Sequence, residues 1–353
     1  MDLLSTRISE QTGQASQEKQ TDHFPELRGI IKERGLLDRQ PAYYTFKIIS
    51  TLALLAVSIT VLVVVDNFWL QMANAAFLAL VFGQLGYLGH DAGHRGITRS
   101  IRGNEMVSLG AVFLIGLSRS WWVTKHNQHH DTPNNLELDP HTLLPLMAFS
   151  PEAAIGKPRF LQRMVVHQAF YYPPLLLLEG LGIRLASAMF LSSRRQVKYP
   201  VVEPLLMVLH FALYLGLLFT FLSPLQVLGF VTVHQALFGL YYGLAFAPNH
   251  KGMLIIDADN DLDFMRTQVL TTRNVKASVV TDFMYGGLNH QIEHHLFPSM
   301  PRNKLGEAGK IVKAFCETRD ISYHETGTWR SYREILASLH EAGAPLRRRA
   351  SSS

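Results

Sequence analysis

The sequence lacks the features of an ordinary secreted or nucleic-acid-binding protein. Its one cysteine, Cys316, excludes an intramolecular disulfide and a thiolate metal cluster. Charged residues make up only 17% of the chain, against about 25% in typical soluble domains, while hydrophobic residues make up 48%. The net charge of +5 is not gathered in a basic stripe with interleaved aromatic residues, so no nucleic acid is expected as a partner. The composition predicts a membrane protein, and its positive charge favours attraction to anionic lipid or to an acidic electron carrier.

Four stretches are long and apolar enough to cross a bilayer. The hydrocarbon core is about 30 Å thick and takes roughly 20 helical residues. The joins at Asp66-Asn67 and Ser223-Pro224 are very short, so the spans should form two helical hairpins. The predicted fold class is an all-α integral membrane protein with four transmembrane helices, near 46–65, 68–89, 201–222 and 225–247.

The distribution of basic residues predicts the orientation in the membrane. Neither short join contains lysine or arginine. With four spans, all 33 lysines and arginines fall on the other side, together with both termini and residues 90–200. Cytoplasmic loops are enriched in these residues, so we expect both termini on the cytoplasmic side.

Two further apolar segments are not counted as spans. Residues 106–117 are uncharged, but their length fits a re-entrant or interfacial segment. Residues 164–191 are longer but are interrupted by Pro173-Pro174, Glu179 and Arg184, and we expect them to lie in the interface.

Three histidine-rich boxes follow apolar segments. Because residues three and four apart share one face of a helix, the ligands within each box can converge. Imidazole suits zinc, copper, iron and nickel, and seven histidines exceed what one tetrahedral zinc site needs. We therefore expect two metal ions, held by the boxes His90-Asp-Ala-Gly-His94, His126-Asn-Gln-His129-His130 and Gln291-Ile-Glu-His294-His295.

The boxes, their order and the phrase Gly286-Gly-Leu-Asn-His-Gln-Ile-Glu-His-His-Leu-Phe-Pro298 resemble the membrane fatty acid desaturase family. Glutamine at the first position of the third box is similar to the front-end subgroup, the delta-6 and delta-5 type that includes linoleoyl-CoA desaturases. The resemblance covers about residues 40–325. It implies two iron ions in a non-haem centre, molecular oxygen as co-substrate, an electron donor and a fatty acyl-CoA or acyl-lipid substrate.

The resemblance also suggests a domain plan. We expect a polar lead-in at 1–40, a membrane desaturase domain at 41–342 whose part from about 303 forms a helical cytoplasmic cap, and a basic, serine-rich tail at 343–353. Many front-end enzymes carry a fused cytochrome domain marked by His-Pro-Gly-Gly. That motif is absent, so we expect a separate donor, either ferredoxin or a cytochrome.

The resemblance implies one further ligand, His250 at the end of the fourth span, where family members carry an additional histidine. A helix-end histidine can also be a cap or a pH switch. Gln291 can coordinate a metal through its amide oxygen or orient a neighbour. His290 is the second choice, because one residue turns a helix by about 100° and points it away from the box.

Acidic residues beside the boxes are candidates for fixing the histidine tautomers. A carboxylate that receives the second ring N–H orients a metal-bound imidazole, although each of these residues can equally be a solvated charge. The candidates are Asp91, Asp131, Asp282 and Glu293. His141, in Asp139-Pro-His141, is expected to be a loop residue.

The predicted activity is the insertion of a cis double bond into an acyl chain. A fatty acyl hydroxylase, carotenoid ketolase or conjugase of the same superfamily is the nearest alternative. A membrane metal transporter would need polar residues within its spans, and these are almost absent. A lipid-binding protein without catalysis would tolerate loss of His129 or His294.

Overall fold

The computed structural model describes residues 22–193 and 195–351 and is predominantly helical. The chain forms two compact units. Unit 1 comprises the residues up to Asp38, Asn127–Tyr171 and the residues from Phe246 onward, and unit 2 comprises Arg39–His126 and Tyr172–Ala245. The first part of the predicted lead-in, 1–21, and the last two residues of the predicted tail lie outside the described residues.

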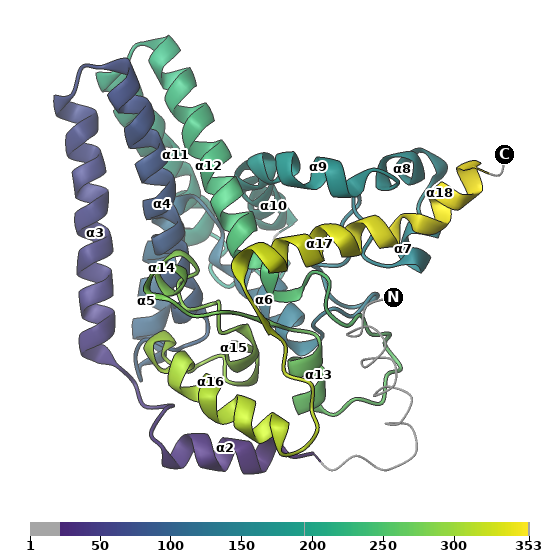
Figure 1. Ribbon diagram of the computed structural model, residues 1–353. Helices are drawn as coiled ribbons and strands as arrows, with labels where there is room; N and C mark the ends of the chain where they lie inside the picture. Colours follow the sequence, from purple (N-terminus) through teal and green to yellow (C-terminus); the bar gives the residue numbers. More distant parts are fainter. Residues whose placement is uncertain (1–21, 194, 352–353) are drawn as a thin grey trace. The chain divides into compact units, whose positions relative to one another are not determined.

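Unit 2 contains most of the long apolar helices, which run side by side in Figure 1. The four predicted spans coincide with α3, α4, α11 and α12 to within a few residues at each end. Among the described residues, three helices, α6, α9 and α12, have residues in both units. The helices of unit 2, with these three included, are α3 (Pro41–Val64), α4 (Phe68–Gly93), α5 (Ile101–Ile115), α6 (Arg119–Asp131), α9 (Gln168–Leu175), η1 (Leu176–Leu178), α10 (Glu179–Ser193), α11 (Val202–Phe221) and α12 (Pro224–His250).

Helices α3 and α4 are joined through buried polar groups. Asn67 caps α4 by accepting a hydrogen bond from Leu70 N at 3.1 Å. Ser58 Oγ donates to Asn74 Oδ1 at 2.7 Å, and the Asn74 amide donates back to Ser58 O at 3.0 Å. Because an unpaired polar group is costly in an apolar environment, these reciprocal bonds hold the two helices in one register.

Length and composition admit five membrane-spanning helices rather than the four predicted. Among the described residues, the additional helix is Gln168–Ser193, which contains α9 (Gln168–Leu175), η1 and α10. The sequence placed this segment in the interface because of its prolines and charges. The prolines do not end the helical path, since a 3₁₀ turn follows them and continues into α10. An interfacial position for this segment therefore stays a prediction.

The charge of Arg184 and the neighbouring glycines explain how this segment packs. The two terminal nitrogens of the buried Arg184 guanidinium donate to Gly180 O at 2.6 Å and to Ile115 O at 2.8 Å, both within unit 2. On α12, Gly239 and Gly243 lie four residues apart and face η1 and α10. A Cβ on Gly239 would lie 2.5 Å from Gly180 N and 2.7 Å from Leu176 O. Small residues at this spacing permit close approach of membrane helices.

The segment predicted to be re-entrant falls in α5. The chain turns by 109° between α5 and α6, a geometry that fits either a broken span or a re-entrant loop. The sequence-based expectation for residues 106–117 is compatible with this bend.

Unit 1 contains a two-stranded sheet and several helices, whose labels appear in Figure 1. Strands β1 (Asn274–Val275) and β2 (Glu325–Thr326) are parallel, with Asn274 opposite Glu325. The core lies among α2, α13, α15 and α16, so part of the predicted lead-in packs as a helix. The helices are α2 (Phe24–Glu33), α7 (Pro151–Ile155), α8 (Arg159–Val165), α13 (Phe264–Leu270), α14 (Val279–Met284), α15 (Gln291–Leu296), α16 (Arg302–Glu317), α17 (Thr328–Ala342) and α18 (Ala344–Ser351).

We expect Gly239→Ala to destabilise the protein by about 1–3 kcal/mol, because the new methyl group meets backbone atoms that no rotamer change can move. Gly216→Ala on α11 is the matched control, since a Cβ there meets no atom within 4 Å. Thermal unfolding of both purified variants in detergent measures the difference. Equal melting temperatures for the two variants would contradict the close packing described for α12.

Candidate metal centre

The first box lies at the end of α4 in unit 2. His90 is in the last turn, and His94 is the residue that caps the helix. His126 on α6 joins them, with ring centroids 4.9 Å from His90 and 4.8 Å from His94. The candidate ligand nitrogens of these three residues lie within 4.8 Å of one another. Unit 2 thus brings the first box together with the first histidine of the second box.

A glycine permits this approach. A Cβ on Gly93 would lie 2.2 Å from the ring of Trp122. Trp122 in turn stacks on His126, with centroids 4.5 Å apart and the planes inclined by 26°. Gly93 therefore lets the indole lie against the end of α4, and the indole orients the imidazole of His126.

A second cluster lies in unit 1 and joins the second box, the third box and the end of α12. His129, His250 and His295 are buried, and their candidate ligand nitrogens also lie within 4.8 Å of one another. The Nε2 atoms of His129 and His250 are 3.1 Å apart. His250 was expected from the resemblance, and the structure places it beside box residues.

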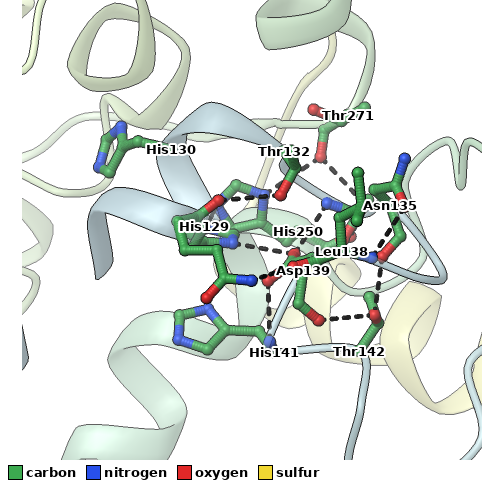
Figure 2. Close-up of polar contacts among 12 residues, drawn as sticks. His129, His130, Thr132, Asn135, Leu138, Asp139, His141, Thr142, His250 and Thr271 are labelled. Carbon is green, nitrogen blue, oxygen red and sulfur yellow. Dashed lines mark hydrogen bonds and ion pairs between the residues drawn. The ribbon is translucent and has the colours of Figure 1, made fainter. Parts of the chain in front are cut away.

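The outer nitrogen of each ring in this cluster faces a fixed acceptor. His129 Nδ1 lies 2.9 Å from Asp139 Oδ2, and His250 Nδ1 lies 3.2 Å from Thr271 O; Figure 2 shows both acceptors. His295 Nδ1 lies 2.8 Å from Gln268 Oε1. The Gln268 amide nitrogen donates to His130 O at 3.0 Å, which turns its oxygen toward His295.

These contacts determine where the ring protons lie. A carboxylate or carbonyl oxygen only accepts, so Nδ1 of His129 and of His250 carries the proton. In the neutral rings both Nε2 atoms then present lone pairs to each other across 3.1 Å. Two facing lone pairs repel unless a proton or a cation lies between them, so the arrangement favours a bound cation.

Asp139 is the buried anion of this cluster. Besides His129, its carboxylate accepts hydrogen bonds from Asn134 N and His141 N, both at 2.8 Å. Figure 2 shows the contact with His141. Burial raises the pKa of this carboxyl, but the hydrogen bonds from His129 and His141 and the charge of Lys251 outweigh burial and hold the pKa below its ordinary value. Asp139 therefore remains ionised at neutral pH and can support a positive charge at the cluster.

The last histidine of the second box pairs with the third box. His130 Nε2 lies 3.1 Å from His294 Nε2, and the ring of His130 stacks on His295 with centroids 4.1 Å apart. Figure 2 shows His130 apart from the group around Asp139. His129 and His130 are adjacent on α6 and make different contacts, because successive residues of a helix point about 100° apart.

Gln291 lies beside His250. Its amide nitrogen is 3.1 Å from His250 Nε2, and its oxygen accepts from the Asn249 amide at 3.0 Å. Rotating both amides by 180° exchanges donor and acceptor and turns the Gln291 oxygen toward the histidine. His290, the second choice, precedes α15 and lies 3.7 Å from Asp282, at a position distinct from these contacts.

Of the four acidic candidates, only Asp91 lies close to a histidine proposed as a metal ligand. Its Oδ1 is 3.3 Å from His90 Nδ1. Asp131 is exposed on α6. Glu293 is fully buried, but its oxygens accept from Asn274 and Tyr323 at 2.7 and 2.9 Å, and burial raises its pKa to about 7.

Glu293 therefore anchors α15 to β1 instead of orienting a histidine. Asn274 completes this link by accepting from Ile292 N at 2.9 Å. The exposed carboxylate of Asp282 accepts from the Asn289 amide at 2.8 Å, at the start of the third box.

The sequence reading missed three residues that contact the unit 1 cluster. They are Asp139, Gln268 and Thr271. Asp139 stands ten residues after His129, and Thr271 acts through its backbone, so neither shows helical spacing to a box. His141 is in a loop, as expected, but its ring lies 4.3 Å from that of His129.

Comparisons with known proteins point to one family. The fatty acid desaturase family model matches residues 67–327. The chain is 28% identical to an acyl-lipid (9-3)-desaturase of the moss Physcomitrium patens, over 90% of this chain and 62% of the moss protein. It is 32% identical to the Delta(6)-fatty-acid desaturase fat-3 of Caenorhabditis elegans, over 88% of this chain and 72% of the nematode protein.

A third relative is the Delta(8)-fatty-acid desaturase 2 of Arabidopsis thaliana, 25% identical over 92% of this chain and 75% of the plant protein. These names are consistent with the front-end subgroup that the third box resembles. Because the family model covers most of the chain, including all three boxes, the resemblance is confirmed: this chain belongs to the fatty acid desaturase family.

Proposed function

We propose that this protein is an oxygen-dependent fatty acyl desaturase that introduces a cis double bond with front-end regioselectivity. The observation that carries the proposal is the buried cluster of His129, His250 and His295, whose Nδ1 atoms all face fixed acceptors, in a chain of the desaturase family. The relatives named as Delta(6) and Delta(8) enzymes support the front-end assignment.

The donor atoms fit a transition metal. Imidazole nitrogens bind such ions at about 2.0–2.1 Å, so two nitrogens 3.1 Å apart can share one ion. Two pairs meet this condition, His129 with His250 and His130 with His294. A nitrogen-rich set without thiolate suits iron among several metals, and family membership favours iron.

We assign one iron ion to the unit 2 histidines and one to the unit 1 cluster. When bound, these ions supply the redox chemistry with molecular oxygen that removes hydrogen from an unactivated methylene. Gln291 is placed at the second ion beside His250, and His130 and His294 complete the set. The proposed ligands are His90, His94, His126, His129, His130, His250, Gln291, His294 and His295.

Other side chains of unit 1 prepare the ligands. Asp139, Gln268 and the carbonyl of Thr271 hold the Nδ1 protons of the three clustered histidines, which keeps each Nε2 available. The carboxylate of Asp139 also makes His129 a stronger donor toward a cation. Asp91 is proposed to act similarly on His90. This support fixes the ring positions before metal and substrate bind.

The stoichiometry requires an electron donor. Converting –CH2–CH2– to –CH=CH– releases two hydrogen atoms, and reduction of one O2 to two waters needs two further electrons and two protons. We propose that a separate ferredoxin or cytochrome supplies these electrons, and that the substrate is a fatty acyl-CoA or acyl-lipid. With Gln168–Ser193 in the interface, the four remaining long apolar helices and the distribution of lysine and arginine support an integral membrane protein with its metal centre and termini on the cytoplasmic side.

The activity can be tested by expression in a host fed linoleic and α-linolenic acids. We expect new polyunsaturated fatty acids with the added bond on the carboxyl side, measured by gas chromatography with mass spectrometry. His294→Ala should give none, because it removes one partner of the His130 pair. A bond added only to saturated chains would contradict the front-end assignment, and hydroxylated products would contradict desaturation.

His295→Ala should lower the iron content of the purified protein by about one of its two ions, since a clustered imidazole is lost. Elemental mass spectrometry normalised to protein gives the ratio. The matched control is His340→Ala, which removes an exposed histidine on α17. Unchanged iron in His295→Ala would refute the assignment of this cluster.

Asp139→Asn should reduce iron affinity or activity by about 10- to 100-fold, because the anion that orients His129 is replaced by a neutral amide of similar size. Asp131→Asn is the control, because it removes the same charge from an exposed site on α6. Iron titration and single-substrate turnover measure both variants. Equal behaviour of the two would show that proximity to the box, rather than contact with His129, decides the effect.

A further inference from the structure

A pocket of about 570 Å³ in unit 2 is not used by the proposed metal centre. It lies between the start of α3, the loop that follows the first box, and α5. The pocket is lined by two arginines, Arg39 and Arg99, and by the hydroxyl residues Thr45 and Thr98, as well as by apolar side chains. Its volume is in the range of small-molecule sites in proteins, about 300–1,000 Å³.

The charged side of the pocket is positive. The loop and the start of α5, residues 92–104, contain Arg95, Arg99 and Arg102 and no acidic residue. The nearest acid that follows, Glu105, is bound to Lys198 and Tyr199. Guanidinium groups match phosphate oxygens with parallel N–H donors, so this side of the pocket favours a phosphate.

The loop that carries Arg99 is held in one conformation. Asn104 is buried, and its oxygen accepts from Ile97 N and Thr98 N, both at 3.2 Å. Its amide nitrogen donates to the carbonyl oxygens of Thr98 and Ser100, both at 2.8 Å. The loop therefore needs little ordering when a ligand binds, which lowers the entropic cost of binding.

The other side of the pocket is apolar. Ile48 and Val107 line it and pack against the buried cluster around Tyr44. Beside it, Phe46 on α3 and Met106 on α5 are 66% and 74% exposed. Large exposed apolar side chains on helices of this composition face lipid, so the pocket adjoins the hydrocarbon as well as the basic loop.

We propose that this pocket binds the head of an anionic phosphoglycerolipid, with its phosphate at Arg99 and Arg39 and the beginning of an acyl chain along Ile48 and Val107. This inference rests on the proposed function and specifies the substrate class: the acyl chain is presented on a phospholipid. Basic residues at the ends of membrane helices attract anionic lipid, which agrees with this choice.

The position of the pocket relative to the first box suits front-end chemistry. Tyr44 lines the pocket, and its hydroxyl donates to Asp91 Oδ2 at 2.9 Å. The other oxygen of Asp91 lies 3.3 Å from His90 Nδ1. A front-end enzyme acts only a few carbon–carbon bonds from the carboxyl end, so the carrier head must sit near the metal ligands. Asp91 therefore links the hydroxyl of Tyr44 to the ring of His90.

The test measures lipid binding without turnover. The purified full chain, stripped of lipid in detergent, is titrated with dioleoylphosphatidylglycerol, dioleoylglycerol or oleoyl-CoA and followed by native mass spectrometry. We expect the phosphatidylglycerol to bind and the phosphate-free lipid to bind far more weakly. Arg99→Ala and Arg99→Gln should each weaken phosphatidylglycerol binding by about tenfold or more, as expected for loss of a charge-assisted hydrogen bond.

Arg102→Ala is the matched control. It removes the same charge from an exposed position on α5 that does not line the pocket, and should change binding by less than about twofold. Equal weakening by the Arg99 and Arg102 variants would overturn the proposal in favour of general surface attraction. Arg99-dependent binding of oleoyl-CoA alone would overturn it in favour of coenzyme A as the carrier.

Iron content is measured on the same samples to separate the two proposals. The Arg99 variants should retain wild-type iron, because Arg99 contacts no candidate ligand among the described residues. Phospholipid binding that depends on Arg99, in a protein that fails to desaturate lipid-linked chains in the feeding experiment, would overturn the proposed function while leaving the lipid site standing.

Discussion

The structure depends on the need of buried imidazole rings for partners at both nitrogens. A neutral ring has one N–H that must find an acceptor and one lone pair that must find a donor or a cation. Seven of the eight histidines proposed as ligands are buried. In unit 1 the acceptors come from two separate parts of the chain: the loop at Asp139, and helix α13 with its C-cap Thr271. Satisfying these rings therefore requires the fold around them to be complete.

The fold supplies that precision through close packing and buried polar links. Because glycine on α12 has no Cβ, backbone atoms of the neighbouring helices can approach it closely. Gly93 likewise leaves room for the indole that orients His126. Helix α15 is only six residues long and has little stability alone. Its position is fixed instead by Glu293 and Asn274, which tie it to β1 and Tyr323. Glu293, which the sequence made a candidate for orienting a histidine, thus has a structural role.

The lipid site and the metal centre share one physical theme. In both sites a rigid, preorganised set of donors lies at the end of a long apolar helix. The polar part of an amphiphilic substrate can bind there while its apolar part contacts the helix. Asn104 fixes the loop at Arg99, as Asp139 fixes the ring of His129. An acyl chain of low chemical reactivity carries few groups that a protein can recognise. The carbons that react must therefore be selected by binding of the head and by the distance between the head and the metal. The Tyr44–Asp91–His90 connection supplies a short path of that kind.

The sequence by itself determined the family, the helical class and the box histidines, because helical spacing and apolar length are local properties that need no knowledge of the fold. It also identified the four long apolar helices to within a few residues, but it did not settle the status of the segment around Pro173-Pro174, where the terminal nitrogens of Arg184 donate to backbone carbonyls. Only the tertiary structure decided which histidines face one another, since His129 and His250 are 121 residues apart in the chain. It also selected Asp139 over Asp131 as the partner of the second box. The reason is physical: proximity in sequence places a carboxylate near a helix, but burial and the direction of the ring N–H determine whether it can accept the proton.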